Sequence, residues 1–285
     1  MEIKFTVKKI LLTFIFLCNS FSQNLEIKIY LEKNVFIQGE DVNLPIELIN
    51  HEDKDILIEM PSIKTGSLDI NLTDSKRENY YYKGGTVEGS SKSLFEPGAR
   101  CVGCINLDKG YASLKNMSGV TVLSKGTYSV KVIFYPDNDN RSNKIESNSI
   151  NFTVNVPEGK EMLAFEEYKK GYSSYWAYRD TEFVRIFDNI YKTYPNSVYT
   201  PHVLQLLQGV YHVRLLDTVK SKHYAQLLLQ YPNSTRVEEG VRFLMRNFKE
   251  EDKIIFLDSL KIIYRNTYLE KYIDDYLKYS LIRKN

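Results

Sequence analysis

Two cysteines have the most suggestive chemical spacing in the chain, because Cys101 and Cys104 form a C-x-x-C pair. Such a pair carries out thiol redox chemistry when it opens a helix after a strand, where the helix N-terminus lowers a thiol pKa. Here Val102 and Ile105 are typical of a strand, and no second C-x-x-C or H-x3-5-H motif supplies the further ligands that zinc needs. The pattern favours a local disulfide in an oxidising compartment, with buried free thiols as the main alternative and redox or metal chemistry as a minor one.

The other residue types that carry catalysis are scattered along the chain. Four histidines are present and none is spaced for a shared metal ion or an acid–base motif: His51, His202, His212 and His223. No nucleophile elbow, phosphate-binding loop or dinucleotide fingerprint occurs. We therefore expect no catalytic residue, no cofactor and no metal. An enzyme whose residues converge from distant positions is left as an alternative.

A cluster of aromatic residues stands out in the second half of the chain. It consists of Tyr172, Tyr175, Trp176 and Tyr178, and it contains the only tryptophan. Tyr and Trp are favoured at recognition surfaces because each offers a large apolar area and a polar tip. Two interpretations stay open: the cluster binds a partner, or it fills a junction between domains. The second is favoured, because a junction needs apolar cover.

The first 22 residues resemble a secretory signal peptide. Basic residues precede the short apolar run Ile10–Cys18, and small residues follow it before Gln23. The run is too short to span a bilayer, which takes about 20 apolar residues. We expect cleavage before Gln23 and export to the periplasm or the extracellular space, with possible attachment to the cell envelope. No other segment is apolar and long enough to remain in a membrane.

Length and composition indicate a globular protein of two domains. The chain has 285 residues, of which 43% are hydrophobic and 26% charged, which excludes a disordered polymer. Its 38 basic and 36 acidic residues nearly balance, so a nucleic-acid-binding surface is not expected. The hydrophobic pattern changes near Pro157–Gly159, which divides the chain into residues 23–156 and 157–285.

Residues 23–156 are expected to form an antiparallel β-sandwich. Apolar and polar residues alternate in about eight short runs, such as Tyr128–Phe134 and Ile150–Val156, separated by turn residues. The segment Leu123–Tyr128 resembles the tyrosine corner of immunoglobulin-like sandwiches, in which the Tyr hydroxyl bonds backbone a few residues upstream. Gln38–Val42 also resembles the opening of a strand in bacterial immunoglobulin-like modules. The resemblance implies a fold and says little about function.

Residues 157–285 are expected to be helical, with about seven helices marked by apolar residues at helical spacing. The segments Tyr194–Ser197, Tyr231–Ser234 and Tyr264–Thr267 recur at spacings of 37 and 33 residues. This phrase between helix pairs resembles the tetratricopeptide-like repeats of bacterial envelope proteins, which implies a short α-solenoid with a concave surface. The third copy departs from the pattern because Arg265 replaces Pro. A generic helical bundle is the alternative.

Together these patterns favour an exported, non-catalytic interaction or scaffold protein of the periplasm or cell envelope, with a protein partner. A carbohydrate- or polymer-binding accessory protein is the first alternative, with the aromatic cluster as a stacking platform for a glycan. An envelope enzyme is the second alternative.

Overall fold

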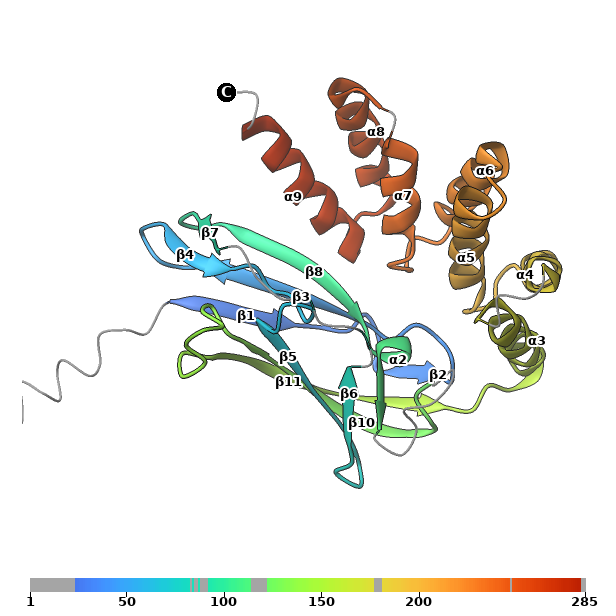
Figure 1. Cartoon of the computed structure of the whole chain (residues 1–285), viewed down its shortest axis with the longest axis horizontal. Coiled ribbons are helices and arrows are strands. Elements are labelled where there is room, and N and C mark those ends of the chain that lie inside the picture. The colour runs from blue at the N-terminus through green and yellow to red at the C-terminus, as the bar shows by residue number, and fades with distance from the viewer. Residues whose placement is uncertain are drawn as a thin grey trace, which may run out of the picture.

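The computed structural model describes residues 24–82, 84, 87, 92–113, 122–176, 181–246 and 248–282. Within these ranges the strands come first and the helices follow, with the change between Asn155 and Gly159 (Figure 1). This layout agrees with the predicted order of a β half and an α half. The expected signal segment 1–22, the cleavage site at Gln23 and the aromatic residue Tyr178 lie outside the described residues.

The described residues of the β half form three sheets. One has the strand order β1-β3-β8, a larger one has the order β2-β11-β10-β5-β6-β9, and β4 pairs with β7. The strands are β1 (Leu25–Ile29), β2 (Val35–Ile37), β3 (Asn43–Asn50), β4 (Ile56–Glu59), β5 (Leu68–Asp74), β6 (Asn79–Tyr82), β7 (Lys92–Phe95), β8 (Arg100–Asn106), β9 (Tyr111–Ser113), β10 (Gly126–Phe134) and β11 (Ile145–Asn155). The short helix α2 (Leu107–Gly110) joins β8 to β9.

The prediction of an antiparallel immunoglobulin-like sandwich is wrong. The larger sheet is mixed, because β2 runs parallel to β11, with Val35 opposite Thr153. Strand β1 lies in the small sheet, and the next strand, β2, joins the large sheet beside β11. Alternating hydrophobicity shows which face of a strand is buried, but it does not show which strand lies beside it or in which direction.

The local contact behind that prediction is nevertheless present. The Tyr128 hydroxyl donates to the Ser124 carbonyl at 2.8 Å, at the entry of β10. Along β10 the side chains of Tyr128, Val130, Val132 and Phe134 are all buried. The period-2 pattern therefore identified the core face correctly, although the sheet around it differs from the expected one.

The α half consists, within the described residues, of helices α3–α9. Their bounds are α3 (Gly159–Trp176), α4 (Glu182–Thr193), α5 (Thr200–Val213), α6 (Thr218–Leu228), α7 (Val237–Met245), α8 (Glu250–Ile263) and α9 (Tyr268–Ile282). Helices adjacent in sequence pack on one another from α3 to α7, and α8 packs on α9. The stripe expected on α4 is buried, at Phe183, Ile186, Phe187 and Ile190. The resemblance to tetratricopeptide-like repeats stays a prediction. None of the described helices is both long and apolar enough to cross a bilayer.

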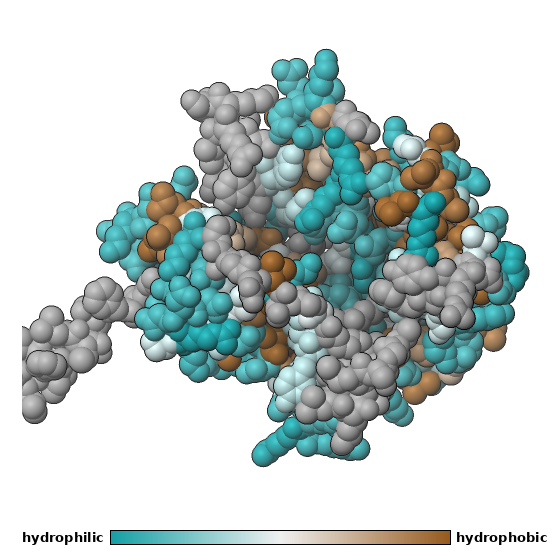
Figure 2. Space-filling model, viewed as in Figure 1, coloured by the Kyte–Doolittle hydropathy of each residue, from teal (hydrophilic) through white to brown (hydrophobic). Residues whose placement is uncertain are grey.

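The two halves are in direct contact. The segment between β2 and β3 packs on α3 and α5, where the Tyr199 hydroxyl donates to the Gln38 carbonyl at 2.8 Å. Gly39 has a φ of +81°, and a Cβ there would lie 2.5 Å from the Phe165 ring, so this contact needs glycine. At the far end α9 contacts β8. A hollow lies between the halves, and the residues visible around it are mainly hydrophilic (Figure 2).

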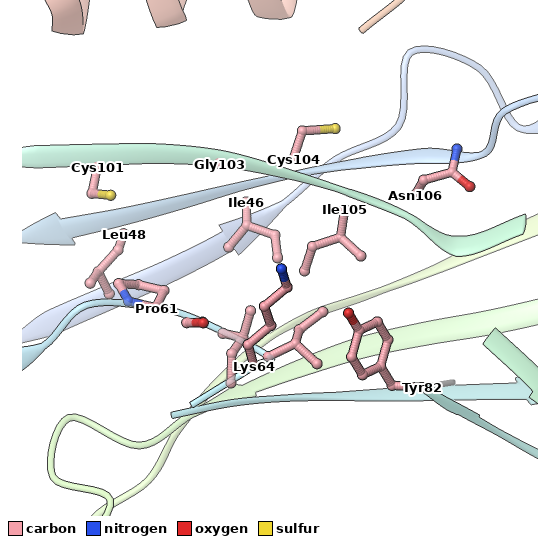
Figure 3. A pocket seen from close by; sticks show the side chains of 13 residues that line it. Ile46, Leu48, Pro61, Lys64, Tyr82, Cys101, Gly103, Cys104, Ile105 and Asn106 are labelled. Atoms are coloured by element: carbon pink, nitrogen blue, oxygen red, sulfur yellow. The ribbon is translucent and has the colours of Figure 1, made fainter. Parts of the chain in front are cut away.

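Cys101 and Cys104 are free thiols in the structure, which is the alternative that the sequence left open to a local disulfide. Both residues lie in β8, where positions three apart face opposite sides of the sheet. Figure 3 shows the Cys101 thiol on the side of the cavity between the sheets and the Cys104 thiol on the other side. Burial raises the pKa of the Cys104 thiol, so this group stays protonated and is a poor nucleophile or metal ligand.

Candidate functional site

The candidate site is the hollow between the halves, here called the interdomain cleft. It comprises two adjoining cavities of about 350 and 470 Å³. Both cavities are lined from the β half by Lys33, Glu40, Asp41 and Asn43, and both reach Asn233 of the α half. These volumes fall in the range of small-ligand and peptide-anchoring pockets, which runs from about 300 to 1,000 Å³.

The α half contributes its three repeated segments to this cleft. Asn196 and Ser197 line one cavity, Asn266 and Thr267 line the other, and Asn233 lines both. Each segment closes with the same hydrogen bond, in which the fourth residue donates its N–H to the carbonyl of the tyrosine at 2.9 to 3.1 Å. The third turn differs in its backbone, because Asn266 has a φ of +65°. The repeat in the sequence therefore corresponds to a repeated turn, and all three turns line the cleft.

Tyrosine hydroxyls connect successive copies of the repeat. Tyr231 donates to the Pro195 carbonyl at 2.7 Å, across 36 residues of sequence. Tyr264 donates to the Leu229 carbonyl at 2.7 Å, across 35 residues. Tyr264 is buried, whereas Tyr194 and Tyr231 are half-buried. These bonds fix the spacing of the turns, and so the spacing of the side chains that the turns present to the cleft.

Each turn presents an exposed asparagine: Asn196, Asn233 and Asn266. Among the described residues, none of the three side-chain amides has a hydrogen-bond partner. An amide side chain both donates and accepts hydrogen bonds. The cleft therefore offers a row of unsatisfied donors and acceptors to a ligand.

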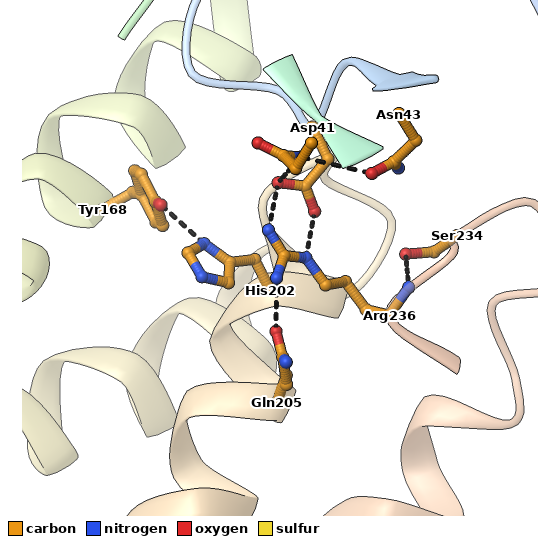
Figure 4. A network of polar contacts seen from close by, with 8 residues as sticks. Asp41, Asn43, Tyr168, His202, Gln205, Ser234 and Arg236 are labelled. Carbon is orange, nitrogen blue, oxygen red and sulfur yellow. Dashed lines mark hydrogen bonds and ion pairs between the residues drawn. The ribbon is translucent and has the colours of Figure 1, made fainter. Parts of the chain in front are cut away.

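A largely buried ion pair between Arg236 and Asp41 lies at the inner side of the cleft. The Arg236 guanidinium, just before α7, donates to both carboxylate oxygens of Asp41 at 2.7 and 2.9 Å (Figure 4). It also donates to Gln205 of α5 at 2.8 Å. Asn106 donates to Asp41 at 3.1 Å, so strand β8 also takes part in the network. Burial alone would lower the pKa of Arg236, but the Asp41 carboxylate raises it, so the guanidinium stays charged.

Beside this pair lies a buried tyrosine–histidine contact. The Tyr168 hydroxyl and His202 Nδ1 are 2.7 Å apart, and both side chains are buried. Burial raises the pKa of the Tyr168 phenol well above its ordinary value, so the phenol keeps its proton at neutral pH. Tyr168 is therefore a poor base.

The charged groups at the mouth of the cleft are also paired. Lys33 forms an ion pair with Glu40, and the second oxygen of Glu40 accepts the Ile37 N–H at 3.0 Å. In the part of the chain that the structure describes, no group of His, Cys, Asp and Glu is arranged to hold a metal ion. The cleft thus presents neutral polar groups and compensated charges.

The aromatic cluster singled out in the sequence lies partly in the core of the α half. Tyr172 and Tyr175 are half-buried, and their rings stack at a centroid distance of 6.4 Å. Tyr172 also stacks on Tyr168 at 5.6 Å, and Tyr175 meets Phe183 edge to face. The structure describes the backbone of Trp176 but not the position of its side chain. These contacts lie within the α half, so the partner-binding and junction interpretations of the cluster stay predictions.

Comparisons with known proteins add little. No family model and no curated protein matches the chain. Among solved structures, a β-glucosidase from Listeria innocua in complex with gluconolactone is 12% identical, with 47% of this chain and 16% of that one covered and a TM-score of 0.28. A β-glucosidase from Erythrobacter marinus is 17% identical, with 46% of this chain and 15% of that one covered and a TM-score of 0.27. The Pseudomonas fluorescens alkylpurine DNA glycosylase AlkC, bound to DNA containing an abasic site analogue, is 14% identical, with 47% of this chain and 31% of that one covered and a TM-score of 0.26. The chain spans only 15% to 31% of the length of these proteins.

Sequence reasoning missed Asp41, Arg236 and the three asparagines as members of one site. The repeat itself was the available signal, because a recurring turn presents its side chains at equivalent positions. No comparable signal marks the ion pair, since Asp41 and Arg236 are 195 residues apart.

Proposed function

We propose that this protein is an exported, non-catalytic binding protein whose interdomain cleft takes an extended polypeptide segment of a partner in the cell envelope. The observation that carries the proposal is the row of exposed asparagines, one in each of the three turns, along a cleft formed by both halves.

An extended polypeptide fits this lining chemically. Its backbone alternates N–H donors and C=O acceptors, and a side-chain amide can bond one of each at the same time. Because neighbouring packed helices lie about 8–10 Å apart, turns on successive helix pairs can bond peptide groups several residues apart, without selecting a particular side chain. Lys33 and Glu40 at the β side of the cleft add charges that can select among segments.

The state of the charged groups supports a binding role rather than catalysis. Asp41 is held by Arg236, and Glu40 is held by Lys33, so both carboxylates already have cationic partners. A general acid or base must come within hydrogen-bond reach of the reacting group, and these carboxylate oxygens are occupied by their partners.

The test begins with selection of linear peptides from a displayed random library on the protein lacking residues 1–22. The affinity of a selected peptide is then measured by titration calorimetry for wild type and for the triple variant Asn196→Ala, Asn233→Ala, Asn266→Gly. Glycine replaces Asn266 because this residue has a φ of +65°. Three lost hydrogen bonds of about 1 kcal/mol each correspond to about 100-fold weaker binding.

A matched triple variant controls for general surface effects. Lys222→Ala, His223→Ala and Gln226→Ala change exposed residues of α6 that do not line the cleft, and should leave the affinity unchanged. Failure to select any peptide, together with binding to a glycan array, would replace the proposal with the carbohydrate alternative. Equal affinity of wild type and the asparagine variant would remove the cleft as the site.

A further inference from the structure

A second cavity lies inside the β half, between its sheets and apart from the interdomain cleft (Figure 3). It has a volume of about 370 Å³. Strands β3 and β8 form one wall, and β5 with the segment that precedes it forms the other. Its apolar lining is Ile46, Leu48, Pro61, Ile63, Leu68 and Ile105.

A missing side chain leaves this space open. Gly103 lies in β8 between Cys101 and Ile105, which face the cavity, and alternation along the strand places all three on the same face. A Cβ on Gly103 would meet no atom within 4 Å. Gly103 and Lys64 are exposed and Ile63 and Ile105 are half-buried, so the cavity opens to solvent and a ligand can enter it.

A single positive charge marks one side of the cavity. The Lys64 side chain extends from the segment before β5, and its amine points between Ile46 and Ile105 (Figure 3). Among the described residues Lys64 has no carboxylate partner. An unpaired ammonium beside an apolar cavity is complementary to a ligand with an anionic head and an aliphatic body.

We propose that this cavity binds a single-chain aliphatic carboxylate, with the chain between the sheets and the carboxylate on the Lys64 ammonium. The site is distinct from the interdomain cleft and does not depend on the function proposed for it.

The probes are straight-chain carboxylic acids of eight, ten and twelve carbons, titrated calorimetrically into the protein below their micelle concentrations. Each methylene that enters the cavity should strengthen binding about fourfold, until the cavity is filled. The alcohols of the same chain lengths have no charge and should bind at least tenfold more weakly. The proposal is overturned if the acids do not bind, or if the alcohols bind as tightly as the acids.

Two variants locate the ligand. Lys64→Gln should weaken the acids at least tenfold and leave the alcohols unchanged, whereas Lys76→Gln, which removes an exposed lysine outside the cavity, should change neither. Gly103→Leu fills the open space at an ordinary strand position and should abolish binding, with an unchanged circular dichroism spectrum as the check on folding. Tight binding to the Gly103→Leu protein places the ligand elsewhere and overturns the proposal.

Discussion

At the scale of single residues, the contact between Asp41 and Arg236 connects the two halves most strongly. Only 9% and 18% of these side chains is exposed, and the carboxylate accepts both guanidinium bonds. Taking two charges out of water is costly, and it is offset only when all their hydrogen bonds are made. The further bonds from Arg236 to Gln205 and from Asn106 to Asp41 meet that requirement.

Removing one partner of this pair should be strongly destabilising. We expect Arg236→Met to lower the free energy of unfolding by about 2–3 kcal/mol, because the largely buried Asp41 carboxylate would lose its cationic partner and keep only the bond from Asn106. Arg185→Met is the matched control, since Arg185 pairs with Glu182 on the surface of α4 with 75% of its side chain exposed. Arg185→Met should lower the free energy of unfolding by less than about 1 kcal/mol. Urea denaturation measures both, and equal losses would contradict a stabilising role for the pair.

At the scale of elements, the repeated turns show how far the sequence could be interpreted. The phrase beginning at Tyr194 and Tyr231 predicted turns between helices, and the structure has them. The third copy, which departs from the phrase, contains the fully buried Tyr264. Local spacing thus predicts local conformation, whereas burial depends on which helices pack around a copy.

The buried phenol of Tyr264 gives a test by pH. Burial raises its pKa to about 12 from the ordinary value near 10. The neutral phenol is therefore favoured in the folded protein, and its stabilisation is complete below pH 10 and lost as the pH rises through 12. Tyr264→Phe removes this titration and the bond to Leu229, at a cost of about 1 kcal/mol near pH 8.

The difference in melting temperature between wild type and Tyr264→Phe should shrink as the pH rises from 9 to 12. Tyr81→Phe changes a tyrosine that is 43% exposed, and its difference from wild type should stay small throughout this range. A Tyr264→Phe difference that is independent of pH would show that this phenol does not titrate as the burial implies.

The same contrast applies to the β half and to the site. Alternation predicted the strands and their core face, and the resemblance of Leu123–Tyr128 to a tyrosine corner predicted the contact at Ser124, because each depends on neighbours in sequence. The parallel pairing of β2 with β11 depends on contacts that a strand pattern does not encode. The cleft depends on contacts between residues far apart in sequence, and for the same reason it was not predictable.

At the scale of the whole molecule, the cleft exists only because the halves are held at a fixed separation. Gly39 allows the closest approach, with the Phe165 ring where a side chain would stand. Tyr199 and Gln38 add a hydrogen bond beside it. We therefore expect the chain to unfold in one transition, in which the two halves lose structure together.

Gly39→Ala should weaken this junction. Its φ of +81° already strains an L-residue, and the new Cβ would force the Phe165 ring to move. Gly98→Ala is the matched control, because Gly98 has a φ of +67° and a Cβ there would meet nothing within 4 Å. The control should cost about 1 kcal/mol from backbone strain alone. Gly39→Ala should cost more and split the unfolding transition, and identical behaviour of the two variants would contradict a tight junction.

The location of the peptide can be measured directly from the side-chain amide signals of the protein in a two-dimensional ¹⁵N spectrum. Titration of a selected peptide should shift the NH₂ signals of Asn196, Asn233 and Asn266, since these amides line the cleft. The NH₂ signal of Asn71, an exposed residue of β5 outside the cleft, should not move. Saturating peptide that leaves the three cleft asparagines unshifted would contradict the assignment of the cleft as the binding site.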